Sequence, residues 1–340
     1  MNKVTLLGID LAKNVFQLLG LNSSGQVVFK KRISSREKLI NFIAGFPVCT
    51  IAMEACGGSN YFARKFLSFG HEIKLIHPAF VKPYVKTNKN DSNDVEGICE
   101  AASRPTMRFV TPKTIEQQDI QSLHRIRSGF IEERTALTNK IRGLLMEYGI
   151  TIAKGIRHIR KLLPDFLEDA ENELSHVARE FLNDLYQQLI KKDENITKYD
   201  KLLQNILHEN EDCKKIEKIE GVGLLTATAV IASIGDAKEF KNGRHLAAFF
   251  GLVSRQQSSG NKQKMLGISK RGNSYTRTLL IHGARSAILA SSKKNDPKSK
   301  WIQALVERAG QNKAAVALAN KNAIIIYALI ANQTQYQKAG

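Results

Sequence analysis

Cysteine and proline are scarce in this sequence, with 4 and 7 residues among 340. The cysteines show no C-x-x-C spacing, so the pattern indicates neither a zinc site nor a disulfide framework. They stand at Cys49, Cys56, Cys99 and Cys213. Few prolines and a hydrophobic share of 43% describe a chain that folds rather than one that stays disordered.

Long hydrophobic runs are also missing. The longest late apolar run, residues 323–331, is well short of the roughly 20 residues that a membrane-spanning helix needs. At the start, the chain enters the apolar run 4–10 without a basic segment, a full hydrophobic region and a cleavage site for export. We therefore expect a soluble, unsecreted, cytoplasmic protein without a membrane partner.

Acidic residues are few compared with basic ones. The sequence has 32 Asp and Glu against 51 Lys and Arg, which gives a net charge of +19. A surface of this charge favours polyanionic partners, above all nucleic acid. The alternative is a generically soluble basic protein, whereas a membrane-surface protein is disfavoured because no long basic amphipathic helix is present.

The first hundred residues alternate between strand-like and helix-like patterns. Three apolar runs, at 4–10, 15–21 and 27–33, are separated by turn-forming residues and predict an antiparallel meander. Helix 35–44, strand 49–53, helix 61–69, strand 72–76 and helix 93–102 are expected to follow. This succession is typical of a ribonuclease-H-like α/β domain.

The remainder of the chain has a helical pattern. Leu, Ile and charged residues recur at helical spacing in 123–148 and 174–207, which predicts two long helices paired as a hairpin or coiled coil. Residues 149–164 are expected to connect them, and the last part is expected to be mostly α-helical. The predicted domains are 1–112, 113–212 and 213–340.

Four carboxylates stand at positions where this fold brings chain segments together. Asp10 and Glu54 end predicted strands, and Asp91 and Asp94 lie on one face at the start of a predicted helix. Such a cluster would repel itself without cations, and Mg²⁺ (or Mn²⁺) prefers oxygen ligands. Paired metal ions stabilise both oxygens of a phosphodiester displacement. Taken singly, each residue is more typical of a helix cap or turn.

A second candidate site is the glycine- and serine-rich segment 251–273. No acidic residue occurs from Gly251 to Leu280, so we expect the segment to lie against phosphate. Its glycines would permit close backbone approach. The alternative is a solvated basic loop, and a catalytic serine would be a weak inference from these residues alone. The candidate phosphate-binding residues are Arg255, Lys262, Lys264, Lys270, Arg271 and Arg277.

Two further segments are candidates for nucleic-acid binding. Gly221 and Gly223 resemble the turn of a helix-hairpin-helix module, whose backbone N–H groups hold a phosphate, although a tight turn without ligand is an equal alternative. The lysines before the aspartate pair could guide nucleic acid or form a solvated loop. They are Lys82, Lys86 and Lys89. His77, beside Pro78, is expected to be a turn or packing residue.

Four motifs together resemble a known family. They are GIDLAK at 8–13, MEACG at 53–57, NKNDSND at 88–94 and LGISKRGN at 266–273. In this order they resemble the DEDD transposases of insertion-sequence family 110, particularly its 1111 subgroup, to which the Piv invertase is related. The resemblance covers nearly the whole chain. Departures are Ser254, where proline is common, and Val95, where alanine is usual.

The resemblance implies a site and a mechanism. The domains would be a RuvC-like N-terminal domain, a coiled coil and a C-terminal transposase domain. The four acidic positions of the family would be Asp10, Glu54, Asp91 and Asp94. Its serine nucleophile, which precedes a glycine, would be Ser259, with Ser258 as the neighbouring alternative.

The resemblance also implies partners. Family members excise and insert their element with a structured non-coding RNA, called bridge or seek RNA, that pairs with target and donor DNA. The partners would be double-stranded DNA of element ends and target, this guide RNA, and further copies in a dimer or tetramer. The competing interpretations are a metal-only nuclease resembling a junction resolvase, and a non-catalytic nucleic-acid-binding protein.

Overall fold

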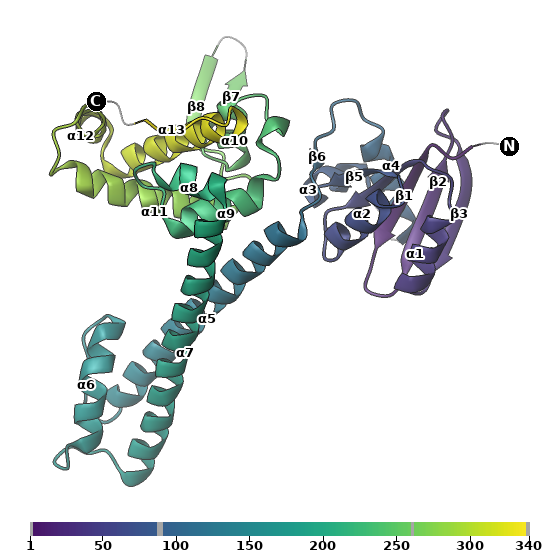
Figure 1. The fold of residues 1–340 in the computed structure, drawn as a ribbon. Coiled ribbons are helices and arrows are strands. Elements are labelled where there is room, and N and C mark those ends of the chain that lie inside the picture. The colour runs from purple at the N-terminus through teal and green to yellow at the C-terminus, as the bar shows by residue number, and fades with distance from the viewer. Residues whose placement is uncertain (1–2, 87–90, 260–261, 338–340) are drawn as a thin grey trace. The chain divides into compact units, whose positions relative to one another are not determined.

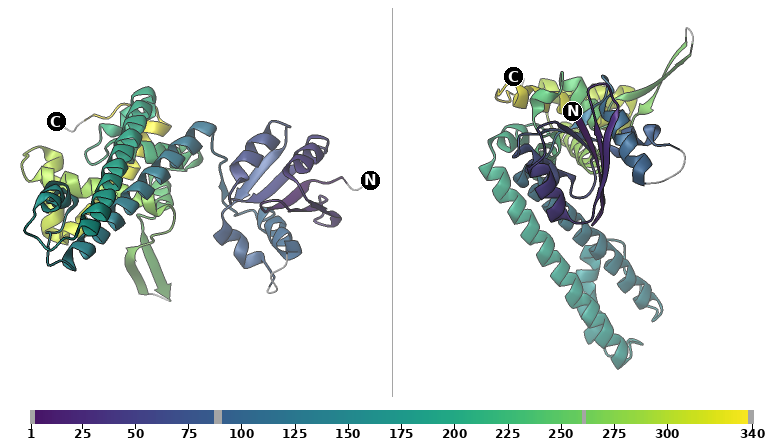
Figure 2. Two further views of the ribbon diagram at one scale, coloured as in Figure 1. Left: turned by 90° about the horizontal axis from the view of Figure 1, so that it is seen from below. Right: turned by 90° about the vertical axis from the view of Figure 1, so that its right-hand side faces the viewer.

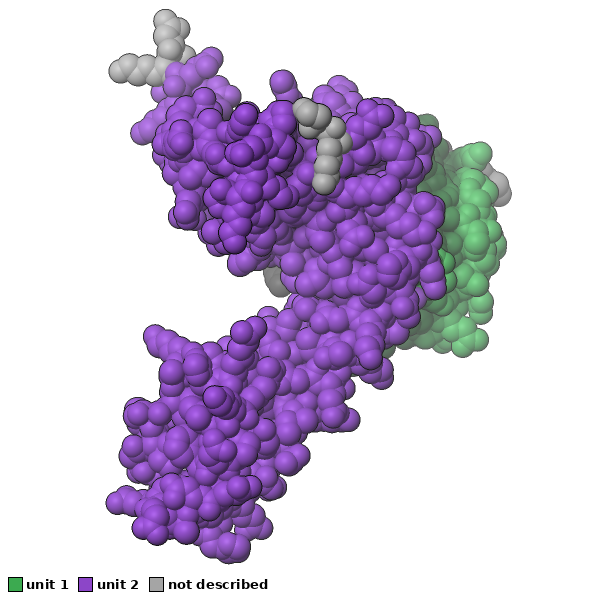
Figure 3. Space-filling view, turned by 60° about the vertical axis from the view of Figure 1, so that its left-hand side comes forward, with its two compact units in different colours: residues 1–116 green, residues 117–340 purple. Residues whose placement is uncertain are grey.

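The computed structural model describes residues 3–86, 91–259 and 262–337, the side chains of residues 91, 92 and 262 excepted. The chain divides into two compact units, residues 1–116 and 117–340 (Figure 3). Each unit contains hydrophobic cores of its own. The predicted division into three domains, with boundaries at 112 and 212, stays a prediction.

Unit 1 is built on a six-stranded sheet in the order β3-β2-β1-β4-β5-β6 (Figure 1). The first three strands pair antiparallel, and β4 and β5 continue the sheet in parallel with β1. The meander predicted from the apolar runs is therefore confirmed. The strands are β1 (Leu6–Leu11), β2 (Phe16–Leu21), β3 (Val27–Ile33), β4 (Thr50–Glu54), β5 (Glu72–Ile76) and the short β6 (Phe109–Val110).

Helices cover both faces of this sheet. On one face, α1 (Arg36–Ala44) and α2 (Ser59–Leu67) bury Leu39 and Phe62 against Ile9 and its neighbours. On the other face, α4 (Asp91–Ala102) buries Val95 and Cys99 against the sheet. Between β5 and α4 the chain forms α3 (Pro78–Val81) and η1 (Lys82–Tyr84), two short elements that the sequence pattern did not predict.

Unit 2 contains two long helices, α5 (Ile115–Met146, whose first two residues belong to unit 1) and α7 (His176–Glu209). Ion pairs join them: Arg127 Nε lies 2.5 Å from Asp200 Oδ1, and Arg134 Nη1 lies 3.0 Å from Asp193 Oδ1. Residue numbers rise along one helix as they fall along the other, so the helices run antiparallel. The two predicted long helices are confirmed; a coiled-coil geometry stays a prediction.

The segment between the long helices was predicted to be a connection, and this is wrong in part. Residues Ile156–Glu168 form α6, which buries Ile159 and Leu163 against α5 and α7. Pro164 lies inside this helix. The sequence interpretation rested on the mixture of Gly, Ile and basic residues in this segment, and proline in a helix interior is also unfavourable because it removes a backbone hydrogen bond. The apolar face of α6 outweighs that cost.

The C-terminal part of unit 2 is mostly helical, as predicted. The helices are α8 (Glu211–Glu217), α9 (Leu224–Ile234), η2 (Ala237–Glu239), α10 (Gly243–Phe249), α11 (Ser274–Ser291), α12 (Pro297–Ala309) and α13 (Gln311–Ala331). Between α10 and α11 the strands β7 (Ser254–Ser259) and β8 (Lys262–Ile268) form a two-stranded ribbon that projects from the helices (Figure 2).

By length and composition, α13 could cross a membrane. The helix is 21 residues long because it begins well before the apolar run 323–331, and its earlier part includes Lys and Asn residues. Half of its most apolar window is buried, and Leu318, Ala319 and Ile326 are completely buried in the core of unit 2. In this fold α13 is a central packing helix.

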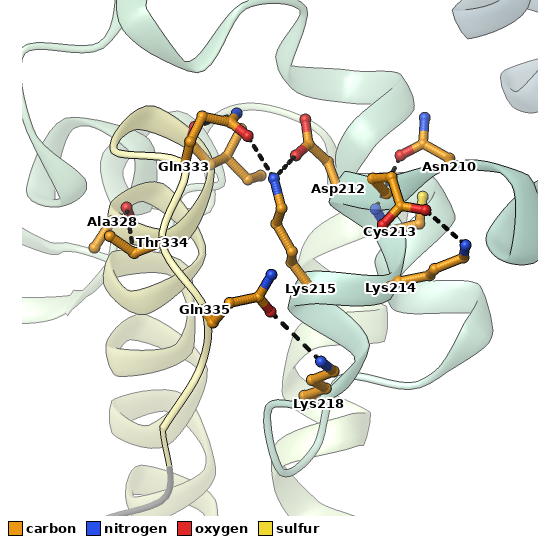
Figure 4. A network of polar contacts seen from close by, with 12 residues as sticks. Asn210, Asp212, Cys213, Lys214, Lys215, Lys218, Ala328, Gln333, Thr334 and Gln335 are labelled. Carbon is orange, nitrogen blue, oxygen red and sulfur yellow. Dashed lines mark hydrogen bonds and ion pairs between the residues drawn. The ribbon is translucent and has the colours of Figure 1, made fainter.

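The chain after α13 lies along α8 (Figure 4). The amine of Lys215 donates to Gln333 Oε1 and lies 2.9 Å from Asp212 Oδ1. The amine of Lys218 lies 3.5 Å from Gln335 Oε1. These contacts hold the last described segment on the helical core.

As predicted, an α/β N-terminal domain is followed by a helical region.

Candidate active site

Asp10 and Glu54 lie side by side because their strands are parallel neighbours. Ile9 pairs with Met53, so the next residue of each strand is a carboxylate. Ile9 and Met53 are completely buried in the core beneath α1 and α2. Successive residues of a strand point to opposite faces. The two carboxylates therefore point to the face that α4 covers, and both are partly buried.

Close packing of α4 brings Asp94 to the same face. A Cβ atom at Gly8 would lie only 2.3 Å from Cys99 Sγ and 3.3 Å from Val95 Cγ2. The missing side chain at Gly8 thus lets α4 lie directly on β1. Asp94 immediately precedes Val95 in the first turns of that helix, at the strand ends that carry Asp10 and Glu54.

The electrostatics show that these acidic groups act on one another. Burial raises the pKa of Glu54, the negative charge of Asp94 raises it further, and His77 lowers it. Burial likewise raises the pKa of the Cys56 thiol, with Glu54 and Asp10 adding to the effect. A carboxylate that is hard to ionise beside other carboxylates gains from a bound cation.

The donor set has the chemistry of a hard divalent cation, which takes oxygen ligands. The described side chains do not yet surround a metal position. Within residues 3–86, 91–259 and 262–337, no three His, Cys, Asp or Glu side chains form a group that could hold a metal ion. The fourth candidate, Asp91, begins α4, but its side chain lies outside the described residues. Asp10, Glu54 and Asp94 fit a metal as oxygen donors, and the negative charge of Asp94, which raises the pKa of Glu54, supports that fit.

His77 has a role that the sequence reasoning only half predicted. It is the N-cap of α3, where Nδ1 accepts a hydrogen bond of 3.2 Å from the backbone N–H of Ala79, so the expected turn role is confirmed. Its effect on the pKa of Glu54 was missed. The position of His77 in the sequence could have indicated this effect, because Glu54 pairs with Ile76 and His77 directly follows Ile76.

The lysines before the aspartate pair differ from one another. Lys82 opens η1 and is exposed, whereas Lys89 lies outside the described residues. The amine of Lys86 lies 2.9 Å from Glu96 Oε2, and Lys30 reaches the other oxygen at 2.7 Å. Hydrogen bonds from Lys30 and Lys86 lower the pKa of Glu96. Lys86 is therefore not simply a solvated loop residue, and its predicted binding role stays a prediction.

The serine segment is a strand pair rather than a loop. β7 and β8 pair antiparallel, with Ser258 opposite Gln263 and Ser259 opposite Lys262, and β7 is exposed along its whole length. Gly, Ser and Asn are poor strand formers, which is why the sequence pattern favoured a loop. The ribbon carries Arg255 at an irregularity of its register.

The two candidate serines lie on opposite faces of the ribbon, because they are adjacent in one strand. The Ser258 hydroxyl accepts a hydrogen bond of 2.9 Å from Gln256 Nε2, so that face is polar and uncharged around it. Ser259 shares its face with Gln257, which pairs with Lys264. Lys264 is exposed. Of the two serines, Ser259 is the one with a described cation on its own face.

Two glycines at the base of the ribbon allow the segments before β7 and after β8 to pack closely against each other. A Cβ atom at Gly251 would lie 2.1 Å from the carbonyl oxygen of Arg271, and one at Gly272 would lie 2.0 Å from that of Phe249. The lack of a side chain at these two residues therefore serves packing within the chain, and a close approach to phosphate stays a prediction. Arg271 and the left-handed Lys270 are exposed.

Arg277 also has an internal function. Its Nη1 donates to the carbonyl oxygens of Phe250 and Arg271, at 3.3 and 3.4 Å. The guanidinium thereby ties α11 to the segment below the ribbon. A contact of Arg277 with phosphate stays a prediction.

The turn between α8 and α9 is fixed by packing as well. Gly221 has a φ of +86°, and a Cβ atom there would lie 2.7 Å from the carbonyl oxygen of Gly283 on α11. Gly221 thus faces another helix, and the predicted binding of a phosphate by the backbone of this turn stays a prediction. Gly223 precedes α9, has no side-chain cap, and faces open space.

Comparison with known proteins identifies the class. A family profile described as "Transposase IS116/IS110/IS902 family" matches residues 213–300, and one described as "Transposase", for the DEDD transposases of the same group, matches residues 7–150. The protein is an insertion-sequence transposase, an enzyme acting on DNA. The chain belongs to the IS110 family of these transposases.

Curated relatives cover almost the whole chain. "Transposase for insertion sequence element IS1111A" of Coxiella burnetii is 49% identical over 99% of this chain and 92% of its own length. "Transposase for insertion sequence element IS1328" of Yersinia enterocolitica is 38% identical over 99% of this chain and 100% of its own length. The "Pilin gene-inverting protein" of Moraxella bovis is 21% identical over 98% of both chains.

Proposed function

We propose that this transposase is an RNA-guided, Mg²⁺-dependent serine recombinase that cuts and rejoins double-stranded DNA at the ends of its element and at a target. The observation that carries the metal-dependent part is the convergence of Asp10, Glu54 and Asp94 on one face of the sheet. Asp91 would complete the set. Manganese could replace magnesium, because it accepts the same oxygen ligands.

A ribonuclease-H or RuvC-type unit 1 is part of this proposal. Its support is the sheet order, in which an antiparallel meander is extended by two strands parallel to β1. The acidic residues stand at the ends of β1 and β4 and at the start of the helix that crosses them.

In the proposed reaction, Ser259 is the nucleophile. Its Oγ attacks the phosphorus of the scissile phosphodiester, a P–O bond to serine forms, and the bond from phosphorus to the 3′ oxygen breaks. The serine proton passes to solvent, and the departing 3′ oxygen takes up a proton. DNA is then joined through its 5′ phosphate to the protein, and attack by another 3′ hydroxyl reverses the chemistry. Lys264, on the face of Ser259, would stabilise the charge on phosphorus.

Bound divalent metal would supply electrostatic stabilisation of the phosphate and lower the barrier to displacement. The carboxylates of Asp10, Glu54, Asp91 and Asp94 would hold it. Ser259 and these carboxylates would form one composite site, contributed by two subunits.

The remaining partners are part of the same proposal. A net charge of +19 suits both DNA and a structured guide RNA. Base pairing of that RNA would choose the DNA sequence, and the antiparallel helices α5 and α7 would act as a coiled coil that assembles a dimer or tetramer. The protein would act in the cytoplasm.

The experiment is to trap covalent adducts on labelled element-end DNA with the full-length protein, guide RNA and Mg²⁺. We expect an adduct with wild type and with Ser258→Ala, none with Ser259→Ala, and a loss of about a thousandfold or more in rate with Asp10→Asn. An adduct that persists in Ser259→Ala would refute the serine assignment.

Other outcomes favour other functions. Cleavage by wild type without any adduct would favour a metal-only nuclease of the junction-resolvase type. Undiminished recombination by a variant that carries both Asp91→Asn and Asp94→Asn would remove the acidic site from the mechanism. Binding without any cutting, with RNA and Mg²⁺ present, would favour a non-catalytic nucleic-acid-binding protein.

A further inference from the structure

The edge strand β3 carries three consecutive basic residues with different surroundings. Lys31 Nζ lies 4.2 Å above the ring of Phe42 on α1. Lys30 Nζ lies 2.7 Å from Glu96 on α4. Arg32 is exposed, and among the residues that the structure describes no hydrogen bond or ion pair holds its guanidinium. Of the three, Arg32 is the one without an evident structural task.

The register of the sheet places Arg32 in line with the acidic site. Asp10 pairs with Gln17 on β2, and Gln17 pairs with Arg32 on β3. Directly paired residues of a sheet point to the same face. The three side chains therefore form a row that Glu54 continues on β4. Arg32 lies two strand spacings, or about 10 Å, from Asp10 along this row.

This row lies just beyond the cover of α4. Two residues earlier on β1, and on the same face, Gly8 pairs with Leu19 of β2. This pair is buried beneath Val95 and Cys99 of α4. One step further along the strands, Asp10 and Gln17 are only partly buried and Arg32 is exposed. Among the described residues, the row from Asp10 to Arg32 is thus polar and more exposed on β1 and β2 than the preceding row.

We propose that Arg32, aided by Gln17, binds a phosphate of the nucleic-acid strand whose reacting phosphodiester lies at Asp10, Glu54 and Asp94. This inference rests on the proposed function of that site. Carboxylates repel a polyanion, so a strand that enters their field needs cations beside it. A guanidinium binds phosphate with two parallel hydrogen bonds, and a glutamine amide donates one more.

A structural alternative makes a different prediction. Basic residues on edge strands also prevent sheets from joining edge to edge. In that role Lys31 and Arg32 would be interchangeable, since they are neighbours on the same strand with the same charge. Lys31 and Arg32 point to opposite faces of the sheet. Phosphate binding beside the acidic residues therefore requires Arg32 and does not require Lys31.

The matched pair Arg32→Gln and Lys31→Gln tests the inference in the full-length protein. The probe is a fluorescent single-stranded DNA oligonucleotide, whose affinity is measured over a series of salt concentrations without metal. We expect Arg32→Gln to weaken binding roughly tenfold at low salt and to reduce the slope of log affinity against log salt by about 0.7. Lys31→Gln should leave both nearly unchanged, and Arg32→Lys should restore part of the affinity.

A position-specific measurement guards against binding elsewhere on this basic protein. A photoreactive benzophenone amino acid at position 32 should crosslink to the probe, and the same group at position 31 should not. Equal effects of the two Gln variants, equal crosslinking, or an unchanged slope in Arg32→Gln would each overturn the inference. Binding is read without any DNA cutting, so failure of the recombinase proposal would be a separate result.

Discussion

The Nδ1 atom of His124 on α5 lies 2.9 Å from the hydroxyl oxygen of Tyr275 on α11, and its Nε2 atom lies 3.0 Å from the hydroxyl oxygen of Thr228 on α9. The imidazole is almost completely buried, at 3% exposure. It thereby connects the long helix α5 to both α9 and α11. A neutral ring suits this place, because one nitrogen can donate and the other accept.

The stability of unit 2 should depend on the pH through His124. The pKa of His124 is lowered from an ordinary 6.5 to about 4, mainly by burial and also by the charge of Arg127, while Asp200 opposes the shift. The unfolded state binds the proton more readily, so the stabilisation is complete above about pH 6.5 and is lost as pH falls toward 4. We expect a loss of about 3 kcal/mol across that window, measured by chemical unfolding.

The control for this prediction is His124→Gln, which keeps a polar side chain without a titrating group. Its unfolding free energy should be lower at neutral pH but less sensitive between pH 6.5 and 4. If the two proteins lost stability in parallel over this range, His124 would not be the group responsible.

A glycine pair holds the α8–α9 turn against α11, and alanine there should be costly. A Cβ atom at Gly283 would lie 1.9 Å from the carbonyl oxygen of Gly221. Gly283→Ala should destabilise unit 2 by about 3 kcal/mol, because backbone cannot move aside as a side chain can. Gly129→Ala, in the middle of α5 with open space around it, should instead stabilise by about 0.5–1 kcal/mol. Thermal unfolding of both variants checks the sign, and a harmless Gly283→Ala would contradict the packing.

The sequence predicted the parts of the fold that depend on local patterns. The run containing Ile9 is apolar and is separated from the next runs by turn-forming residues, and Leu182 and Leu189 repeat with helical spacing, so both the meander and the long helices could be expected. The acidic residues could be predicted to meet because the ends of parallel neighbouring strands meet at one edge of a sheet. That reasoning needed only the order of the elements.

Contacts between distant segments could not be predicted in the same way. Nothing local shows that Gly221 lies against Gly283, so its role in packing the turn on α11 could not be predicted. The mixed composition of residues 149–164 did not predict α6, whose tertiary packing outweighs the unfavourable local preference of Pro164. The row from Asp10 to Arg32 depends on strand register, which a pattern of apolar runs fixes only to within a residue or more.

Gly8 should matter for the site through the position of α4. Gly8→Ala would place a methyl group 2.3 Å from Cys99 Sγ and 3.3 Å from the Val95 carbonyl oxygen, so the Cys99 side chain or α4 itself, with Asp94, must shift. We expect a loss of about 1–3 kcal/mol in stability together with a loss of recombination. Adding Cys99→Ala removes the obstructing sulfur and should restore part of both. Recombination assays and unfolding curves on the single and double variants test this, and full activity of Gly8→Ala would contradict it.

Asp94 should contribute to cation binding even when no DNA is present. Its charge helps to raise the pKa of Glu54, a repulsion that a bound divalent ion would relieve. Asp94→Asn keeps the size of the side chain and removes the charge, so the affinity for Mn²⁺, measured by titration calorimetry on the free protein, should fall about tenfold or more. Asp184→Asn, at an exposed position of α7, should leave it unchanged. Because the assay needs neither guide RNA nor DNA, equal Mn²⁺ affinities for the two variants would exclude Asp94 as a ligand whatever the reaction proves to be.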